Sequence, residues 1–263
     1  MADSSPAAVD TDERALTDRA VRHGMKAVIL AGGVGTRLRP LTYVMPKCLL
    51  PVGGVPLLEY TIRYLKSYDI SEFVVCVAYL KKQVMDAMGD GSRLGVKVQY
   101  AEAESALGTA GQLKTADQYI DDTFLAMNGD IVTSLNIDNI IKLHRKSQRI
   151  ATIALKRFEV KIPYGHITTD AVGTILDFSE KPTLEFLANA GVYVFERRLL
   201  DAIPPGKVCS LETEIFPRLI AKGEKPISYY EEAYWSDVGT LVDFEKVNDE
   251  FLKQPVNMSR ASP

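Results

Sequence analysis

A glycine-rich segment followed by cationic side chains is the part of the chain best suited to chemistry. Gly32, Gly33 and Gly35 follow an apolar run, and Arg37 and Lys47 come soon after them. Glycines let a backbone adopt positive φ and approach a ligand closely, and successive N–H groups of such a loop form a concave anion site. Arginine suits bidentate contact with phosphate, whereas lysine supplies a point charge. The segment therefore predicts a phosphate-binding loop.

Two common phosphate-loop patterns do not fit this segment. A Walker A loop requires glycine and lysine followed by serine or threonine, and that order does not occur here. The dinucleotide fingerprint G-x-G-x-x-G would place its third glycine at Leu38. An ordinary turn between strand and helix needs one or two glycines and does not explain the nearby cations. A different class of phosphate site is indicated.

Several motifs together resemble the sugar-1-phosphate nucleotidyltransferases, also called nucleotide-sugar pyrophosphorylases. The sequence G-G-x-G-T-R-L-x-P-L-T at 32–42 is followed by P-K-x-L-L-P at 46–51. The resemblance extends from about residue 25 to about residue 249, most of the chain. Further motifs follow in the family's order: L-G-T-A-G at 107–111, N-G-D at 128–130, E-K-P at 180–182, N-A-G-V-Y at 189–193 and W-S-D-V-G at 235–239.

The resemblance implies a reaction in which a sugar-1-phosphate oxygen attacks the α-phosphorus of a nucleoside triphosphate and pyrophosphate leaves. The nucleophile is already an anion, so positioning and electrostatic stabilisation supply most of the catalysis. Arg37 would hold the pyrophosphate portion, Lys47 would reach the reacting phosphates and Lys181 would contact the sugar phosphate. Asp130 and Asp237 would bind Mg²⁺, which prefers carboxylate oxygens. The ordinary alternatives are a turn residue at Asp130 and a helix N-cap at Asp237.

The resemblance also implies two sets of substrate-binding residues. The first surrounds the glycine loop and includes L-G-T-A-G, whose amides are expected to face the base while its glycines leave room for the ring. The second comes from the latter half of the chain. The nucleotide set is Leu30, Ala31, Gly32, Gly33, Gly35, Thr36, Arg37, Lys47, Gly108, Thr109 and Gly129, and the sugar-phosphate set is Tyr164, Gly165, Glu180, Lys181, Asn189, Gly191 and Glu212.

The base and the sugar are less firmly indicated than the reaction. L-G-T-A-G and the S-x-E-x-E stretch at 210–214 resemble mannose-1-phosphate guanylyltransferases, which favours GTP with mannose-1-phosphate. UTP, dTTP, CTP or ATP with glucose-, heptose-, amino-sugar- or cyclitol-1-phosphate are alternatives. A regulatory paralogue without catalysis is another, although all five expected catalytic residues are present. A Rossmann-type oxidoreductase would need an acidic ribose anchor, and Glu59 near that spacing falls within an expected helix.

The elements that must position these residues alternate between strand and helix in the first half. This pattern predicts an α/β fold with a mostly parallel sheet covered by helices on both faces and a ligand site at the strands' carboxyl ends. The later strands predict a small antiparallel addition to this sheet. The resemblance implies that this addition binds the sugar and that the fold is Rossmann-like and GT-A-like. Apolar patterning places strands at 26–31, 73–78, 96–101, 124–127, 150–157, 166–169, 174–178 and 190–195, and helices at 57–68, 80–88, 109–119, 137–147, 211–222 and 241–252.

Composition sets the remaining expectations. The 263 residues suit a flexible N-terminal extension at 1–24, with Met25 as an alternative start, a catalytic domain at 25–253 and a C-terminal tail at 254–263. A net charge of −3 with scattered basic residues argues against nucleic-acid binding. No apolar run approaches the ~18 residues of a membrane span. Three cysteines without metal or disulfide spacing predict reduced thiols and a cytoplasmic location. A homo-oligomer is left open.

Overall fold

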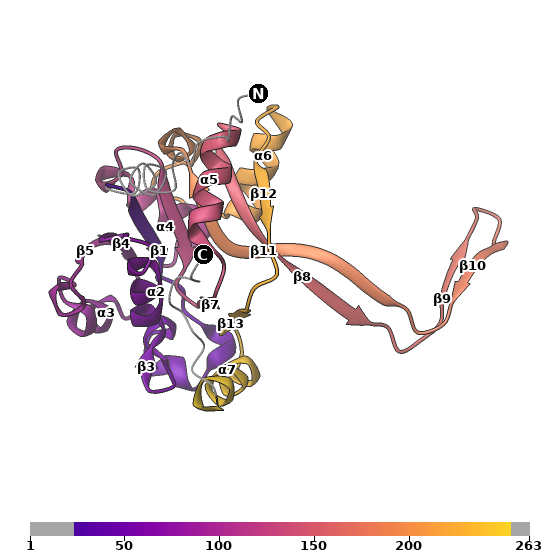
Figure 1. Cartoon of the computed structure of the whole chain (residues 1–263), viewed down its shortest axis with the longest axis horizontal. Coiled ribbons are helices and arrows are strands. Elements are labelled where there is room, and N and C mark those ends of the chain that lie inside the picture. The colour runs from indigo at the N-terminus through magenta and orange to yellow at the C-terminus, as the bar shows by residue number, and fades with distance from the viewer. Residues whose placement is uncertain (1–23, 254–263) are drawn as a thin grey trace, which may run out of the picture.

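The computed structural model describes residues 24–253, and seven of its strands form one mixed sheet (Figure 1). The strand order is β12-β8-β11-β6-β1-β4-β5. β1 is parallel to β4 and β6, and β4 is parallel to β5. β11 runs antiparallel to β6 and β8, whereas β12 is parallel to β8. The bounds are β1 Lys26–Leu30, β4 Glu72–Val77, β5 Lys97–Glu102, β6 Phe124–Asn128, β8 Ala151–Lys161, β11 Thr183–Phe195 and β12 Ile227–Tyr230.

Helices cover both faces of this sheet, as the sequence predicts. Side chains of a strand point alternately to its two faces, so Ala27 and Ile29 join one core with α2, α3 and α5. Val28 and Leu30 join a second core with α4 and α6. The expected α/β class is confirmed. The bounds are α2 Leu57–Lys66, α3 Lys81–Met88, α4 Gly108–Thr115, α5 Ile137–Ser147 and α6 Phe216–Ala221.

A small antiparallel ribbon joins the two halves of the chain beside the sheet. It consists of β7 Ile131–Thr133 and β13 Trp235–Asp237, and α7 Leu241–Lys253 follows it. Val132 and Val238 pack with α7 in a third, smaller core. Neither strand was predicted from the sequence, because each has only three residues. Their pairing brings residues about a hundred positions apart to one edge of the sheet.

The helix boundaries differ from the expectations at two places. The helix expected at 109–119 ends as α4 at Thr115, and a 3₁₀ turn follows at Asp117–Tyr119. The helix expected at 211–222 divides into a π-helical turn, Leu211–Ile215, and α6. Pro217 lies in the first turn of α6, where proline is tolerated. It has no N–H to donate to the carbonyl of Thr213, so one continuous α-helix through 211–222 cannot form.

β8 and β11 continue beyond the sheet as a two-stranded arm, with β9 His166–Thr169 and β10 Ile175–Ser179 at its far end (Figure 1). We call residues 156–188 the arm. The two long strands pair without interruption along it, and their register shifts between Asn189 and Tyr193, where they enter the sheet. β11 therefore begins seven residues before the expected position 190. The expected antiparallel addition is this arm.

The expectations for the two ends of the chain concern residues that the structure does not describe. The N-terminal extension, except Gly24, and the C-terminal tail lie outside residues 24–253. Within that range, no helix is both long enough and apolar enough to cross a membrane.

Candidate active site

A pocket of about 250 Å³ opens where β1 and β6 end, as expected for the carboxyl edge of a parallel sheet. Polar and charged side chains share it with backbone from the glycine loop. It therefore gathers most of the predicted nucleotide set, while Gly32, Gly108 and Thr109 do not line it. The lining residues are Leu30, Ala31, Gly33, Gly35, Thr36, Arg37, Lys47, Cys48, Gly129, Asp130 and Gly239.

Hydrogen bonds on both sides fix the glycine loop. The N–H of Gly32 donates to Gln112 Oε1 at 2.8 Å, and Thr42 Oγ1 donates to the carbonyl oxygen of Gly35 at 2.8 Å. Gly35 has φ +65°, and a Cβ there would lie 3.0 Å from Thr42 Cγ2. Any larger residue would be strained and crowded at this position. Gly33, by contrast, is exposed and has open space around it, so a ligand can approach its backbone.

Two cations of the predicted catalytic set flank the loop. Lys47 forms an ion pair with Asp130, and the lysine side chain is only 15% exposed. Arg37 is exposed, and within residues 24–253 it has no ion-pair partner. Its Nη2 atom would lie 3.3 Å from a Cβ placed on Gly239. Arg37 therefore stands at the pocket with its guanidinium group free to receive an anion.

The two predicted metal ligands meet through the small ribbon. Asp130 precedes β7, and Asp237 lies opposite Ile131 in the β7–β13 pairing. The backbone N–H of Val238 also donates to the carbonyl oxygen of Asp130 at 2.9 Å. Burial raises the pKa of Asp237, and the negative charge of Asp130 raises it further. Because the two negative charges repel each other, a bound cation would stabilise both carboxylates in their ionised form.

The donor set fits Mg²⁺. Asp130 Oδ1 is buried and has no hydrogen-bond partner within the described residues, so one hard oxygen is available to a cation. Within residues 24–253, no group of three or more His, Cys, Asp or Glu side chains is arranged so that it could hold a metal ion alone. Mg²⁺ commonly uses one or two carboxylates and completes its octahedron with waters and substrate phosphates. Asp130 and Asp237 are therefore sufficient protein ligands for such an ion.

A second polar group links the predicted base and sugar residues. Thr109 Oγ1 donates to Glu212 Oε2 at 2.7 Å, and the Tyr193 hydroxyl donates to Glu212 Oε1 at 3.3 Å. Asn189 Nδ2 in turn donates to the Tyr193 hydroxyl at 2.7 Å, and Asn189 Oδ1 accepts from the N–H of Gly191. Sequence reasoning did not single out Tyr193, although it ends the N-A-G-V-Y motif. The structure brings these four predicted residues together around it.

The L-G-T-A-G segment packs against the backbone of Cys209, a contact that was not predicted from the sequence. The N–H groups of Ala110 and Gly111 donate to the carbonyl oxygen of Cys209 at 3.0 and 3.1 Å. A Cβ on Gly108 would lie 2.5 Å from that same oxygen. These two amides are therefore already paired within the protein, and the glycine at 108 makes room for backbone at 209.

Four predicted sugar-phosphate residues lie on the arm, away from the pocket. Tyr164, Gly165, Glu180 and Lys181 are exposed and lie in the segments that connect β8 to β9 and β10 to β11. A Cβ on Gly165 would meet the ring of Phe178 at 2.8 Å, which explains the glycine there. Because β8 and β11 stay paired as they leave the sheet, none of these four residues lines the pocket of its own chain.

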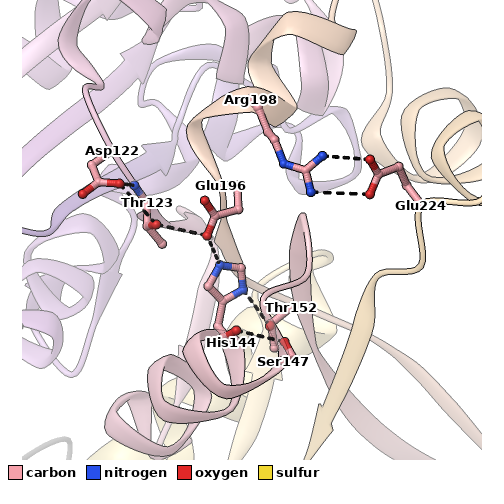
Figure 2. A network of polar contacts seen from close by, with 8 residues as sticks. All are labelled: Asp122, Thr123, His144, Ser147, Thr152, Glu196, Arg198 and Glu224. Carbon is pink, nitrogen blue, oxygen red and sulfur yellow. Dashed lines mark hydrogen bonds and ion pairs between the residues drawn. The ribbon is translucent and has the colours of Figure 1, made fainter.

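A buried histidine forms a separate polar network (Figure 2). The network includes Thr123, which directly precedes β6, whereas the pocket opens at the other end of that strand. His144 Nε2 lies 2.9 Å from Glu196 Oε1, and Nδ1 lies 2.9 Å from Thr152 Oγ1. A carboxylate only accepts, so Nε2 carries the proton and the threonine hydroxyl donates to Nδ1. Burial lowers the pKa of His144. Thr152 is fully buried, and its hydrogen bond with His144 joins α5 to β8 of the sheet.

Comparison with known proteins identifies the family of the chain. The model of the nucleotidyl transferase family matches residues 26–254. A mannose-1-phosphate guanylyltransferase of Mycobacterium tuberculosis (strain ATCC 25618 / H37Rv) is 36% identical over 238 residues, covering 88% of this chain and 66% of the relative. A UTP–glucose-1-phosphate uridylyltransferase of Synechocystis sp. (strain ATCC 27184 / PCC 6803 / Kazusa) is 34% identical, covering 84% and 61%. The chain thus spans somewhat less than two thirds of these relatives.

A solved structure shares the fold over nearly its whole length. It is a Bacillus anthracis protein, assigned as a candidate glucose-1-phosphate thymidylyltransferase and crystallised with sucrose. It is 26% identical, with a TM-score of 0.71, and the match covers 89% of this chain and 97% of that one. By sequence and by fold, the chain belongs to the nucleotidyl transferase family.

Proposed function

We propose that the chain is a sugar-1-phosphate nucleotidyltransferase, which joins a nucleoside triphosphate and a sugar-1-phosphate into a nucleotide sugar and releases pyrophosphate. One observation carries the proposal: a single pocket holds the glycine loop, Arg37, Lys47 and Asp130, and β13 sets Asp237 beside it. Two polyanions must meet in this reaction. A site that combines open backbone amides, cations and a metal-binding pair suits that requirement.

The residues divide the work by charge and position. The loop backbone and Arg37 bind the β- and γ-phosphates, and Lys47 neutralises the α-phosphate. A sugar-phosphate oxygen forms a bond to the α-phosphorus while the bond to the β-phosphate oxygen breaks, and that oxygen leaves with the pyrophosphate. Asp130 and Asp237 would hold Mg²⁺, which when bound offsets phosphate charge and orients the phosphates. No side chain need remove a proton, because the nucleophile is already ionised.

For the substrates, we infer GTP and mannose-1-phosphate. The guanylyltransferase of Mycobacterium tuberculosis supports this choice, and so do the L-G-T-A-G and S-x-E-x-E motifs, which resemble those of mannose-1-phosphate guanylyltransferases. Other relatives are named as a uridylyltransferase and a thymidylyltransferase. Other bases and sugars are therefore competing predictions.

A substrate matrix tests the proposal. Five nucleoside triphosphates are each combined with a panel of sugar-1-phosphates in the presence of Mg²⁺, and pyrophosphate release is measured. We expect release only when both substrates are present, and the highest kcat/KM with GTP and mannose-1-phosphate. A higher kcat/KM for another pair overturns the substrate choice. No release from any pair, by folded protein that binds nucleotide, overturns the proposed activity.

A further inference from the structure

The arm carries an apolar face that the described residues of its own chain leave largely exposed. In its pairing, Phe158 lies opposite Phe186 and Val160 lies opposite Leu184, so all four side chains point to one side of the ribbon. The two phenylalanine rings stack at 5.7 Å. Val160, Leu184 and Phe186 are 42%, 47% and 50% exposed. The opposite side of the ribbon is largely charged, so the arm is amphipathic.

The outer end of the arm is apolar as well. Ile167 lies opposite Phe178 in the β9–β10 pair, and both side chains are exposed, as are those of Ile175 and Leu176. A two-stranded ribbon is marginally stable in water on its own, and both of its edges are open to pairing. Contiguous exposed apolar surface of this kind marks an interaction site.

The base of the arm is held firmly against the body. Phe158 meets the ring of Trp235 edge to face at 5.8 Å, and Trp235 Nε1 donates to the carbonyl oxygen of Ala190 at 2.8 Å. The register of β8 and β11 is unbroken along the arm. These contacts direct the arm outward, so its outer end lies far from the body (Figure 1).

The body exposes apolar side chains close in sequence to two residues that line the pocket, Lys47 and Gly239. Val44 is 74% exposed and stands three residues before Lys47, which lines the pocket. Val242 is 72% exposed and stands three residues after Gly239, which also lines it. Met45 and Leu241 add to these two positions. We call these four residues the rim. An apolar ribbon laid across the rim would cover both partners' exposed surfaces.

We propose that two copies of this chain exchange arms, so that each arm lies across the rim of the partner and delivers Glu180 and Lys181 to the partner's pocket. The occupant is a second copy because the arm bears four of the residues predicted to bind the sugar phosphate, and the pocket receives none of these four from its own arm. Reciprocal exchange of an identical element gives a closed two-fold dimer. The role of Lys181 in this inference rests on the proposed function, whereas the exchanged dimer does not.

The oligomeric state tests the exchange without any assay of activity. Sedimentation equilibrium of the whole chain is expected to give a dimer at micromolar concentration. The double variant Leu184→Ser/Phe186→Ser is expected to shift it to monomer, whereas Glu185→Gln, on the charged side of the same strand, is expected to leave the dimer intact. Wild-type protein that sediments as a monomer throughout the micromolar range overturns the proposal, and so does a double variant that is folded and still dimeric.

Complementation tests the delivery of Lys181. Differently tagged Lys181→Ala and Asp130→Asn chains are co-expressed, and dimers that carry both tags are isolated. In exchanged dimers one pocket combines an intact Asp130 with the partner's Lys181, so about half of the wild-type activity per dimer is expected although each variant alone is inactive. If the isolated mixed dimers have no activity, the proposal that Lys181 acts in the partner's pocket is overturned. Lys181 would then act within its own chain. An inactive wild-type protein that dimerises through the arm would count against the proposed function alone.

Discussion

The N–H of Val238 donates to the carbonyl oxygen of Asp130 at 2.9 Å, and this bond sets the Asp237 carboxylate beside that of Asp130. The burial of Asp237 and the charge of its neighbour raise its pKa. The protein therefore holds two carboxylates together at a cost in stability, which a bound cation would offset.

We predict that Asp237→Asn stabilises the metal-free protein by about 1 kcal/mol while it abolishes turnover. The folded pKa of Asp237 is raised, so the destabilisation is fully present at neutral pH and disappears as the pH falls below the unfolded value. Urea unfolding at pH 7 with a chelator measures this change. Asp86→Asn, on the exposed side of α3, is the matched control. A less stable Asp237→Asn protein would contradict the account.

The catalytic charges should matter far more to turnover than to folding. We predict that Asp130→Asn and Lys47→Ala each lower kcat by about 10²–10³-fold, because each removes charge stabilisation at the reacting phosphates. Steady-state kinetics at saturating Mg²⁺ measure the loss, and circular dichroism checks that the fold is retained. Asp86→Asn again serves as the control. Turnover unchanged in either variant removes that residue from the mechanism.

Glu212 should act on substrate binding rather than on the chemical step. We predict that Glu212→Gln raises KM for the sugar phosphate about tenfold, ~1.4 kcal/mol, with a smaller effect on kcat. Its carboxylate accepts from Thr109 and Tyr193, and an amide cannot accept both bonds on two oxygens. Glu214→Gln in the same turn is the control. Equal losses of kcat and kcat/KM in Glu212→Gln, with KM unchanged, would refute this role.

The buried histidine should make stability depend on pH. Burial lowers the pKa of His144 in the folded protein, so below the unfolded value of about 6.5 the unfolded chain binds the extra proton. Stability should therefore fall as the pH drops from 7 toward 5, by up to about 1.4 kcal/mol per pH unit. Urea unfolding over this range measures the slope. The slope should flatten in His144→Gln and persist in His166→Gln, which alters an exposed strand residue. Parallel slopes in all three proteins would contradict the prediction.

The alternation of strands and helices in the first half was predictable because each long element buries a continuous apolar face. Ala27 and Ile29 pack on one side of the sheet and Val28 and Leu30 on the other, so the strand appears in the sequence as an unbroken apolar run. β7 and β13 were not predictable in this way. Each is short, and their stability comes from pairing with each other and from packing on α7.

The candidate site was predictable where one motif supplies both backbone and side chain. Gly35, Arg37 and Lys47 share a pocket, and their closeness in sequence already implied this. The Cys209 contact of Gly108 and the outward course of the arm depend on segments distant in sequence, which no local pattern reveals. The residue that caps α7 was also not predictable from a local pattern. Thr240 caps this helix together with Asp243, so Asp237 does not have the capping role that was its alternative.

The most direct test of the proposed reaction follows the α-phosphorus. Wild-type protein is incubated with Mg²⁺, a sugar-1-phosphate and a nucleoside triphosphate labelled at the α-phosphorus, and the products are separated. We predict that the label appears in a nucleotide sugar, that its formation needs both substrates, and that Asp130→Asn prevents it. Label that stays in the triphosphate, or passes to nucleoside monophosphate without the sugar phosphate, would contradict the account.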